Sequence, residues 1–120
     1  MSKPNAKMVK VTKTELIEFN GGNEKIEVKF PELRKMMLTA RALEHDIRKK
    51  IITILSEDNK LTVTELYLKL KVEQSVASQH LAILRKTGVL DYSRDGKFIY
   101  YSLNKLQLQR IASFIDELIH

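Results

Sequence analysis

Apolar residues recur every three or four positions along much of the chain, which is the period of an amphipathic helix. The pattern predicts helices at residues 31–44, 46–57, 62–70, 74–86 and 104–119. Thr62-Val63-Thr64-Glu65 has the form of a capping box, in which a Thr side chain and a Glu three residues later satisfy the first free N–H groups of a helix. Gly88 is placed to end the fourth helix.

Apolar and polar residues alternate on each side of two turns, which indicates β-hairpins. Residues 89–93 and 98–102 flank Arg94-Asp95-Gly96-Lys97, and Asp-Gly between such runs is a strong hairpin signal. Nearer the N-terminus, short alternating runs surround Asn20-Gly21-Gly22-Asn23, and two interpretations stay open there, a β-hairpin or an arm without regular structure. Residues 1–14 are lysine-rich and weakly patterned, which predicts a flexible start.

The order of these elements predicts a winged helix-turn-helix fold, mainly α-helical with a small β-hairpin as the wing. Residues 31–120 would form the winged helix domain for DNA binding and dimerisation. Residues 1–30 would form an N-terminal arm, in which the extra hairpin is one of the two alternatives.

The composition is that of a globular chain, with 43% hydrophobic and 30% charged residues. The absence of cysteine excludes disulfides, thiolate metal sites and cysteine nucleophiles. No apolar run approaches the length of a membrane span, and the N-terminus lacks the apolar core of a signal peptide. We therefore expect a cytoplasmic protein with no membrane partner.

The net charge of +6 favours a polyanionic partner such as nucleic acid. The basic excess is spread over the first 104 residues, so a basic tail alone does not explain it. The sequence contains no glycine-rich phosphate loop, no nucleophile elbow and no paired acidic motif with a supporting His. We expect neither enzymatic activity nor a cofactor.

From Leu43 to Asn104 the chain resembles the ArsR/SmtB family of bacterial transcriptional repressors. The resemblance rests on the run Gln74-Ser75-x-x-Ser78-x-His80-Leu81 and on the wing Gly96-Lys97-x-x-x-Tyr101. It covers about half of the chain and is more specific than a general helix-turn-helix pattern. It implies a homodimer that represses transcription by occupying an inverted repeat in double-stranded DNA.

One face of the fourth predicted helix is small and uncharged. Ala77, His80, Leu81 and Leu84 would form its buried stripe, so Gln74, Ser75, Ser78, Gln79 and Ala82 point the other way. Amides and hydroxyls on such a face can pair with base edges in the major groove. We expect base contacts from Gln74, Ser75, Val76, Ser78 and Gln79. The alternative is a neutral face that another element covers.

Three further side chains of this helix need an interpretation. Val76 lies at the edge of the two faces, where it would meet a thymine methyl group or fill the core. Glu73 stands where the family commonly has a capping Ser, and its carboxylate would repel phosphate, so we expect it to point aside. His80 lies on the inward stripe, which predicts a hydrogen-bonded structural role.

Cations flank the uncharged face along the sequence. We expect phosphate contacts from Arg85, Lys86, Arg94 and Lys97. In the resembling family the terminal helices form the dimer interface, which here implicates Met36, Met37, Ile111, Phe114, Ile115 and Leu118. The alternative is that these apolar residues pack only on their own core.

The family's metal sites are not reproduced in this sequence. One family site uses Cys in the first helix of the helix-turn-helix, where this chain has Val63-Thr64-Glu65-Leu66-Tyr67. The other, in the last helix, falls on Asn104, Leu106, Glu117 and His120, and Leu106 cannot bind a metal. We expect no metal site. The effector stays open among a small molecule, a protein partner of the arm, and none.

The sequence thus predicts a DNA-binding transcriptional regulator, a repressor acting as a homodimer. The competing hypothesis is a winged-helix adaptor that binds proteins and has lost DNA binding.

Overall fold

The computed structural model describes residues 6–11 and 14–120, and its contacts separate two units, Met1–Leu38 and Thr39–His120. The boundary falls inside helix α1 (Phe30–Leu43), so each unit holds part of this helix. α1 begins one residue before Pro31, which therefore lies in the first turn. N–H groups in the first turn have no acceptor within the helix, so the missing N–H of proline costs no hydrogen bond there. The proposed functional division at residue 30 stays a prediction.

The first unit contains a three-stranded antiparallel sheet in the order β1-β2-β3. Its strands are β1 (Ala6–Val11), β2 (Thr14–Phe19) and β3 (Glu24–Val28), and the short 3₁₀ turn η1 (Asn20–Gly22) joins the last two. Asn20 and Gly21 adopt left-handed φ angles of 54° and 71° in this turn, which favours the Asn-Gly sequence found there. The β-hairpin interpretation of this segment is therefore confirmed.

Strand β1 corrects the expectation of a flexible start, at least for Ala6–Val11. The strand pairs with β2 in a register that places Met8 opposite Ile17. Two lysines interrupt the short apolar pattern of β1, so its sequence gives little indication of a strand. The strand forms through its pairing with β2. Residues 1–5 and 12–13 of the expected flexible segment lie outside the described residues.

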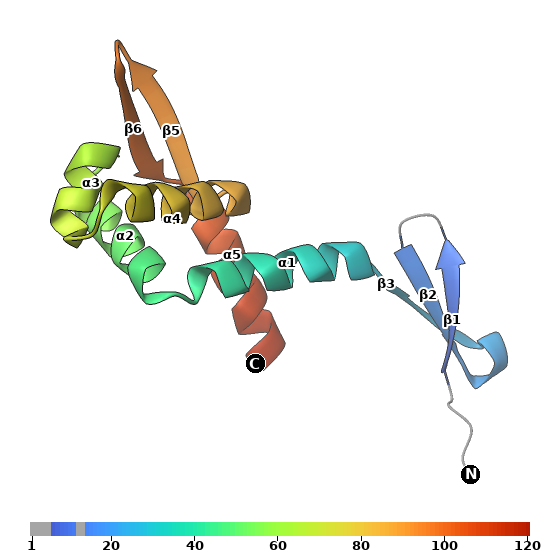
Figure 1. Cartoon of the computed structure of the whole chain (residues 1–120). Coiled ribbons are helices and arrows are strands. Elements are labelled where there is room, and N and C mark those ends of the chain that lie inside the picture. Colours follow the sequence, from blue (N-terminus) through green and yellow to red (C-terminus); the bar gives the residue numbers. More distant parts are fainter. Residues whose placement is uncertain (1–5, 12–13) are drawn as a thin grey trace. The chain divides into compact units, whose positions relative to one another are not determined.

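The second unit has the predicted order of helices followed by a wing (Figure 1). Its elements are α2 (Asp46–Glu57), β4 (Leu61–Thr62), α3 (Val63–Leu70), α4 (Gln74–Thr87), β5 (Leu90–Asp95), β6 (Phe98–Leu103) and α5 (Lys105–Ile119). Figure 1 shows β5 and β6 projecting beyond the helices as a narrow ribbon. β4, too short to be recognised from its sequence, pairs with β6 and extends the wing sheet to the order β4-β6-β5.

The core of the second unit lies where α2, α3, α4 and the base of the wing meet. Ile51, Leu66, Leu81, Leu84 and Val89 are its largest fully buried side chains. The four helical residues among them come from positions that the helical period turns inward, whereas Val89 lies in the short connection between α4 and β5.

Local capping signals fix the ends of α3 and α4. Thr62 Oγ1 accepts a hydrogen bond from the Glu65 N–H at 3.2 Å, and Glu65 Oε1 accepts one from the Thr62 N–H at 3.0 Å, which confirms the capping box. Gly88 ends α4 with a left-handed φ of 81°, as predicted.

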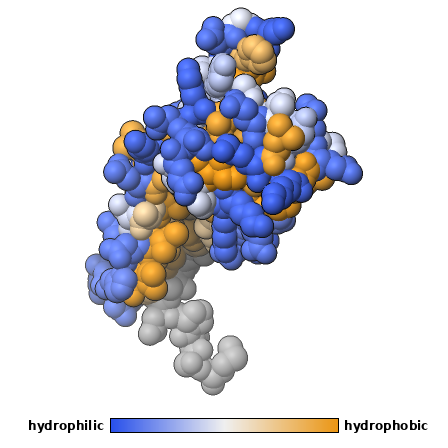
Figure 2. Space-filling model, turned by 90° about the vertical axis from the view of Figure 1, so that its left-hand side faces the viewer, coloured by the Kyte–Doolittle hydropathy of each residue, from blue (hydrophilic) through white to orange (hydrophobic). Residues whose placement is uncertain are grey.

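Figure 2 views the molecule from the side on which α3 lies and shows apolar patches set in a mainly hydrophilic surface. Leu68 of α3 is one of the exposed apolar residues of the second unit. Within the described part of the chain, no helix combines the length and the apolar character that crossing a membrane requires.

Replacing Thr62 with Ala is expected to lower the free energy of unfolding by about 1 kcal/mol, because it removes the side-chain cap of α3. Urea denaturation followed by circular dichroism measures this loss. Thr64→Ala is the matched control, since Thr64 is exposed on the same helix and makes no cap bond. Equal losses in the two variants would contradict the capping role.

Candidate nucleic-acid interface

The uncharged face of α4 is open to solvent. Gln74, Ser75, Ser78, Gln79 and Ala82 are all exposed, and Val76 is half-buried at the edge of the face. On the opposite side, Ala77, Leu81 and Leu84 are fully buried. No described element of the second unit covers the face, so the alternative of a covered neutral surface finds no support in the structure.

The start of α4 is built by the turn that precedes it. Lys71 adopts a left-handed φ of 58° at the end of α3, and the Val72 N–H donates to the carbonyl of Tyr67 at 3.3 Å. Glu73 occupies the N-cap position of α4 but makes no side-chain cap bond, which agrees with its predicted turn away from the helix end. The uncharged face of α4 therefore begins directly after a turn that backbone hydrogen bonds hold in place.

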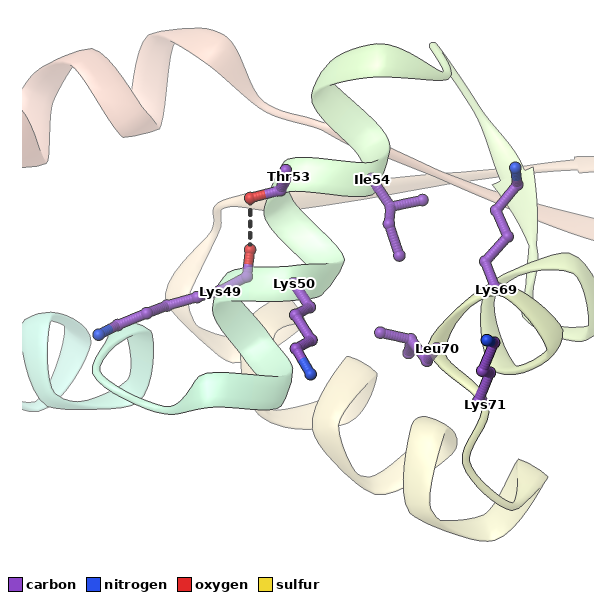
Figure 3. Close-up of a pocket in the computed structure, with 7 residues that line it drawn as sticks. All are labelled: Lys49, Lys50, Thr53, Ile54, Lys69, Leu70 and Lys71. Carbon is purple, nitrogen blue, oxygen red and sulfur yellow. Dashed lines mark hydrogen bonds between the residues drawn. The ribbon is translucent and has the colours of Figure 1, made fainter.

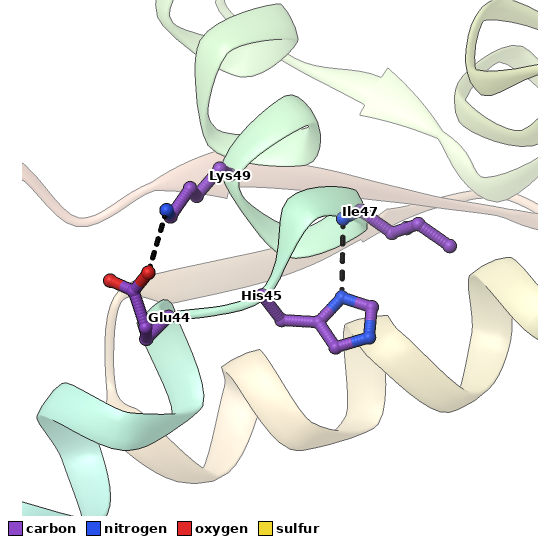
Figure 4. A network of polar contacts seen from close by, with 4 residues as sticks. All are labelled: Glu44, His45, Ile47 and Lys49. Carbon is purple, nitrogen blue, oxygen red and sulfur yellow. Dashed lines mark hydrogen bonds and ion pairs between the residues drawn. The ribbon is translucent and has the colours of Figure 1, made fainter.

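His80 has the structural role predicted for it. Its Nδ1 accepts a hydrogen bond from Arg48 Nε at 3.2 Å, and its ring centroid lies 4.5 Å from that of His45. His45 in turn caps α2, because its Nδ1 accepts from the Ile47 N–H at 3.1 Å (Figure 4). The same guanidinium also donates from Nη1 to the carbonyl of Ala42 at 2.6 Å. The cluster joins α4 to α2 and to the end of α1.

Burial, followed by the neighbouring His45 and Arg48, lowers the pKa of His80 below its ordinary value of 6.5. A proton on Nδ1 would abolish the bond from Arg48 and place a second positive charge beside the Arg48 guanidinium. The folded protein thus favours neutral His80.

The four cations predicted to touch phosphates are exposed on α4 and the wing. The Arg85 guanidinium lies over the Tyr92 ring at 3.8 Å from its centroid, which connects the end of α4 to β5. Lys97 lies over the Phe98 ring at 5.5 Å. Ala82, Arg85 and Lys86 line a shallow depression of about 330 Å³ beside the uncharged face. The cations therefore border that face on the side of the wing.

The positions of the family's second metal site do not gather into a site. Asn104 caps α5, with its Oδ1 accepting from the Gln107 N–H at 3.0 Å. His120 Nδ1 lies 2.8 Å from Asp116 Oδ1, and Asp116 is not one of the four positions of that site. Among the described residues, no three His, Asp or Glu side chains are placed to share a metal ion.

The apolar stripe of α5 is only partly used by the core. Ile111 is buried and Phe114 half-buried, whereas Ile115 is 43% and Leu118 69% exposed. On α1, Met36 is half-buried and Met37 is 61% exposed. The alternative interpretation, in which these residues pack only on their own core, therefore does not account for Ile115, Leu118 and Met37, and the dimer interface stays a prediction.

Sequence reasoning did not single out two features near this surface. Tyr92, the platform under Arg85, carried only the signal of an aromatic residue in a predicted strand. Four lysines line a cleft between α2 and the end of α3, and they form two pairs that are about 20 residues apart in the sequence, with no periodic pattern to link them.

Comparison with known proteins decides the family. A sequence model described as "Bacterial regulatory protein, arsR family" matches residues 45–92. The transcriptional activator HlyU of Vibrio cholerae is 30% identical over 84 residues, which cover 70% of this chain and 77% of HlyU. The transcriptional repressor PagR of Bacillus anthracis is 36% identical over 76 residues, covering 63% of this chain and 76% of PagR. This chain belongs to the ArsR family.

Solved structures agree with this ArsR-family assignment. The crystal structure of PagR matches with a TM-score of 0.58 at 33% identity, over 71% of this chain and 98% of PagR. A homodimeric winged helix-turn-helix DNA-binding domain from Mycobacterium bovis matches with a TM-score of 0.63 at 20% identity, over 76% of this chain and 83% of that domain. The predicted fold is thus confirmed, and this ArsR-family protein is a DNA-binding transcriptional regulator.

The stability of this ArsR-family regulator is expected to fall as the pH decreases below about 6.5. The pKa of His80 is lower in the folded protein than in the unfolded chain, so in this pH range the unfolded chain binds the proton more readily. Proton binding therefore stabilises the unfolded state relative to the folded state. Urea unfolding of the wild type and of His80→Gln at pH 7.5 and pH 5.0 measures the effect, with the variant losing less stability between the two pH values. His120→Gln is the control, and a His80→Gln loss equal to that of the wild type would contradict the assignment.

Proposed function

We propose that this regulator is a repressor that binds an inverted repeat in double-stranded DNA as a homodimer. The observation that carries the proposal is the open, uncharged face of α4, bordered by the cations of α4 and the wing. A protein held over a promoter in this way would block access to it.

Base reading is assigned to Gln74, Ser75, Val76, Ser78 and Gln79. An exposed helix face usually carries charged side chains, whereas this one offers amides, hydroxyls and small groups. These allow a helix to enter the major groove deeply, where a Gln amide can bridge N6 and N7 of adenine. Val76, half-buried at the edge, is suited to a thymine methyl group.

Phosphate binding is assigned to Arg85, Lys86, Arg94 and Lys97. Contacts of this kind supply affinity and fix the register of the protein, but they carry no sequence information. Arg85 keeps its guanidinium charge while it stacks on Tyr92, so the stacking orients the cation without neutralising it.

Dimerisation is assigned to α1 and α5. One reading helix covers only a few base pairs, and two that are separated by one turn of DNA (about 34 Å) read a palindrome. The exposed apolar residues Met37, Ile115 and Leu118 offer the surface that a second copy would cover. The M. bovis domain of the same fold is homodimeric, and PagR is named as a repressor.

Replacing Gln74 or Gln79 with Ala is expected to reduce the preference for the operator over unrelated DNA, at a cost of about 1–3 kcal/mol for each base contact. Replacing Arg94 or Lys97 with Ala is expected to weaken binding to all sequences alike. Fluorescence anisotropy with an operator selected from genomic fragments, and with a scrambled duplex, separates the two effects.

Two results would count against this assignment. Equal losses on operator and scrambled DNA from the Gln variants would remove α4 as the reading helix. Wild-type binding that is absent, or that does not weaken as salt increases, would favour the adaptor without DNA binding.

Replacing Ile115 with Glu is expected to weaken dimerisation at least tenfold (about 1.4 kcal/mol), because a carboxylate would be buried in an apolar interface. Sedimentation velocity over a concentration series measures the dissociation constant. Ser113→Glu is the matched control, since Ser113 is exposed on α5 outside the apolar stripe. A variant dimer as stable as the wild type would exclude Ile115 from the interface.

A further inference from the structure

A cleft lined by lysines lies between α2 and the end of α3, within the second unit (Figure 3). It has a volume of about 420 Å³. We call it the lysine cleft, and its lining consists of Lys49, Lys50, Thr53 and Ile54 from α2 and of Lys69, Leu70 and Lys71 from the end of α3. A volume of this size accommodates a small ligand or part of a larger one.

Carboxylates neutralise only part of the charge around the lysine cleft. Lys49 Nζ lies 2.9 Å from Glu44 Oε1, and Lys69 Nζ lies 3.4 Å from Asp58 Oδ2. Figure 3 shows the Lys49 side chain directed away from the space between the two helices. The hydrogen bond and the charge of Glu44 raise the pKa of Lys49, which keeps that ion pair charged.

Lys50 and Lys71 remain as the cations without an ion-pair partner among the described carboxylates. Lys50 lies in α2 and Lys71 directly follows the last residue of α3, and both line the cleft. Two ammonium groups that line one cleft repel each other, and an anion bound between them would relieve this repulsion. Ile54 and Leu70, both half-buried, form the apolar part of the lining and limit the access of water.

The backbone at Lys71 forms the C-cap of α3. Its φ of 58° and ψ of 42° lie in the left-handed region, which glycine or asparagine adopts at a smaller energetic cost. This conformation ends α3, because the Lys71 N–H donates to the last carbonyls of the helix, and it leaves Lys71 among the residues that line the cleft.

We propose that the lysine cleft is a phosphate-binding site in which Lys50 and Lys71 hold the oxyanion between them. Lys71 lies three residues before Gln74, the first residue of α4, so the backbone of a bound duplex is one source of the phosphate. A free phosphate compound is the other. The first source rests on the proposed function, whereas the second does not.

The test compares Lys50→Gln/Lys71→Gln with Lys25→Gln/Lys35→Gln, which removes the same charge from exposed lysines of the first unit. Glutamine keeps most of the side-chain length. Because glutamine, like lysine, is not glycine, Lys71→Gln leaves the cost of the left-handed backbone conformation at this position similar. Circular dichroism and the unfolding midpoint verify that both double variants are folded.

The first arm measures binding to a 30-base-pair duplex of random sequence as a function of salt. For a backbone phosphate in the cleft, the slope of log K against log salt decreases by about 2 in the cleft variant, since each lost phosphate contact removes roughly 0.9. The control variant keeps the wild-type slope.

The second arm titrates sodium pyrophosphate into each protein by isothermal calorimetry. For a free phosphate ligand, the wild type and the control bind pyrophosphate and the cleft variant binds at least tenfold more weakly. A specific loss in either arm supports the site and identifies its source. Cleft and control variants that behave alike in both arms would overturn it. A wild type that binds no DNA would refute the proposed function, and the pyrophosphate arm would then decide the inference alone.

Discussion

The packing of α4 through Ala77, Leu81 and Leu84 is the constraint on which the rest of this regulator depends. All three side chains are buried, and the small Ala77 allows the helix to approach its neighbours closely. A helix held along one stripe has only one face left for solvent. Because the buried stripe is apolar and the other face carries amides and hydroxyls, the same packing that forms the core also presents the groups suited to DNA bases.

Polar contacts add direction to this packing. Arg48 donates to the carbonyl of Ala42 and to Nδ1 of His80, so one guanidinium holds the end of α1 and the middle of α4. Dispersion forces alone permit a helix to slide or rotate slightly, whereas a hydrogen bond of defined geometry does not. The cluster therefore fixes the position of α4 relative to α2 and to the last residues of α1 within the second unit.

The distribution of charge follows the same architecture. The uncharged face of α4 lies between cations of its own last turn and of the wing on one side and the lysine cleft near its first turn on the other. Under the proposed function, counterion release from phosphates would make such flanking cations effective for any DNA sequence, and the neutral face between them would supply selectivity. Affinity and specificity would then be carried by different side chains on neighbouring elements.

The sequence by itself determined the helices of the second unit, the capping box at Thr62 and Glu65, the stop at Gly88 and the outward face of α4, because each depends on residues within about one or two turns of one another. Tertiary structure decided the rest. β1 and β4 have little pattern of their own and become strands through partners elsewhere in the chain. The hydrogen bond of Arg48 with His80 joins residues far apart in sequence, and Lys50 and Lys71 line one cleft although 20 residues separate them, because α2 packs against α3 and α4.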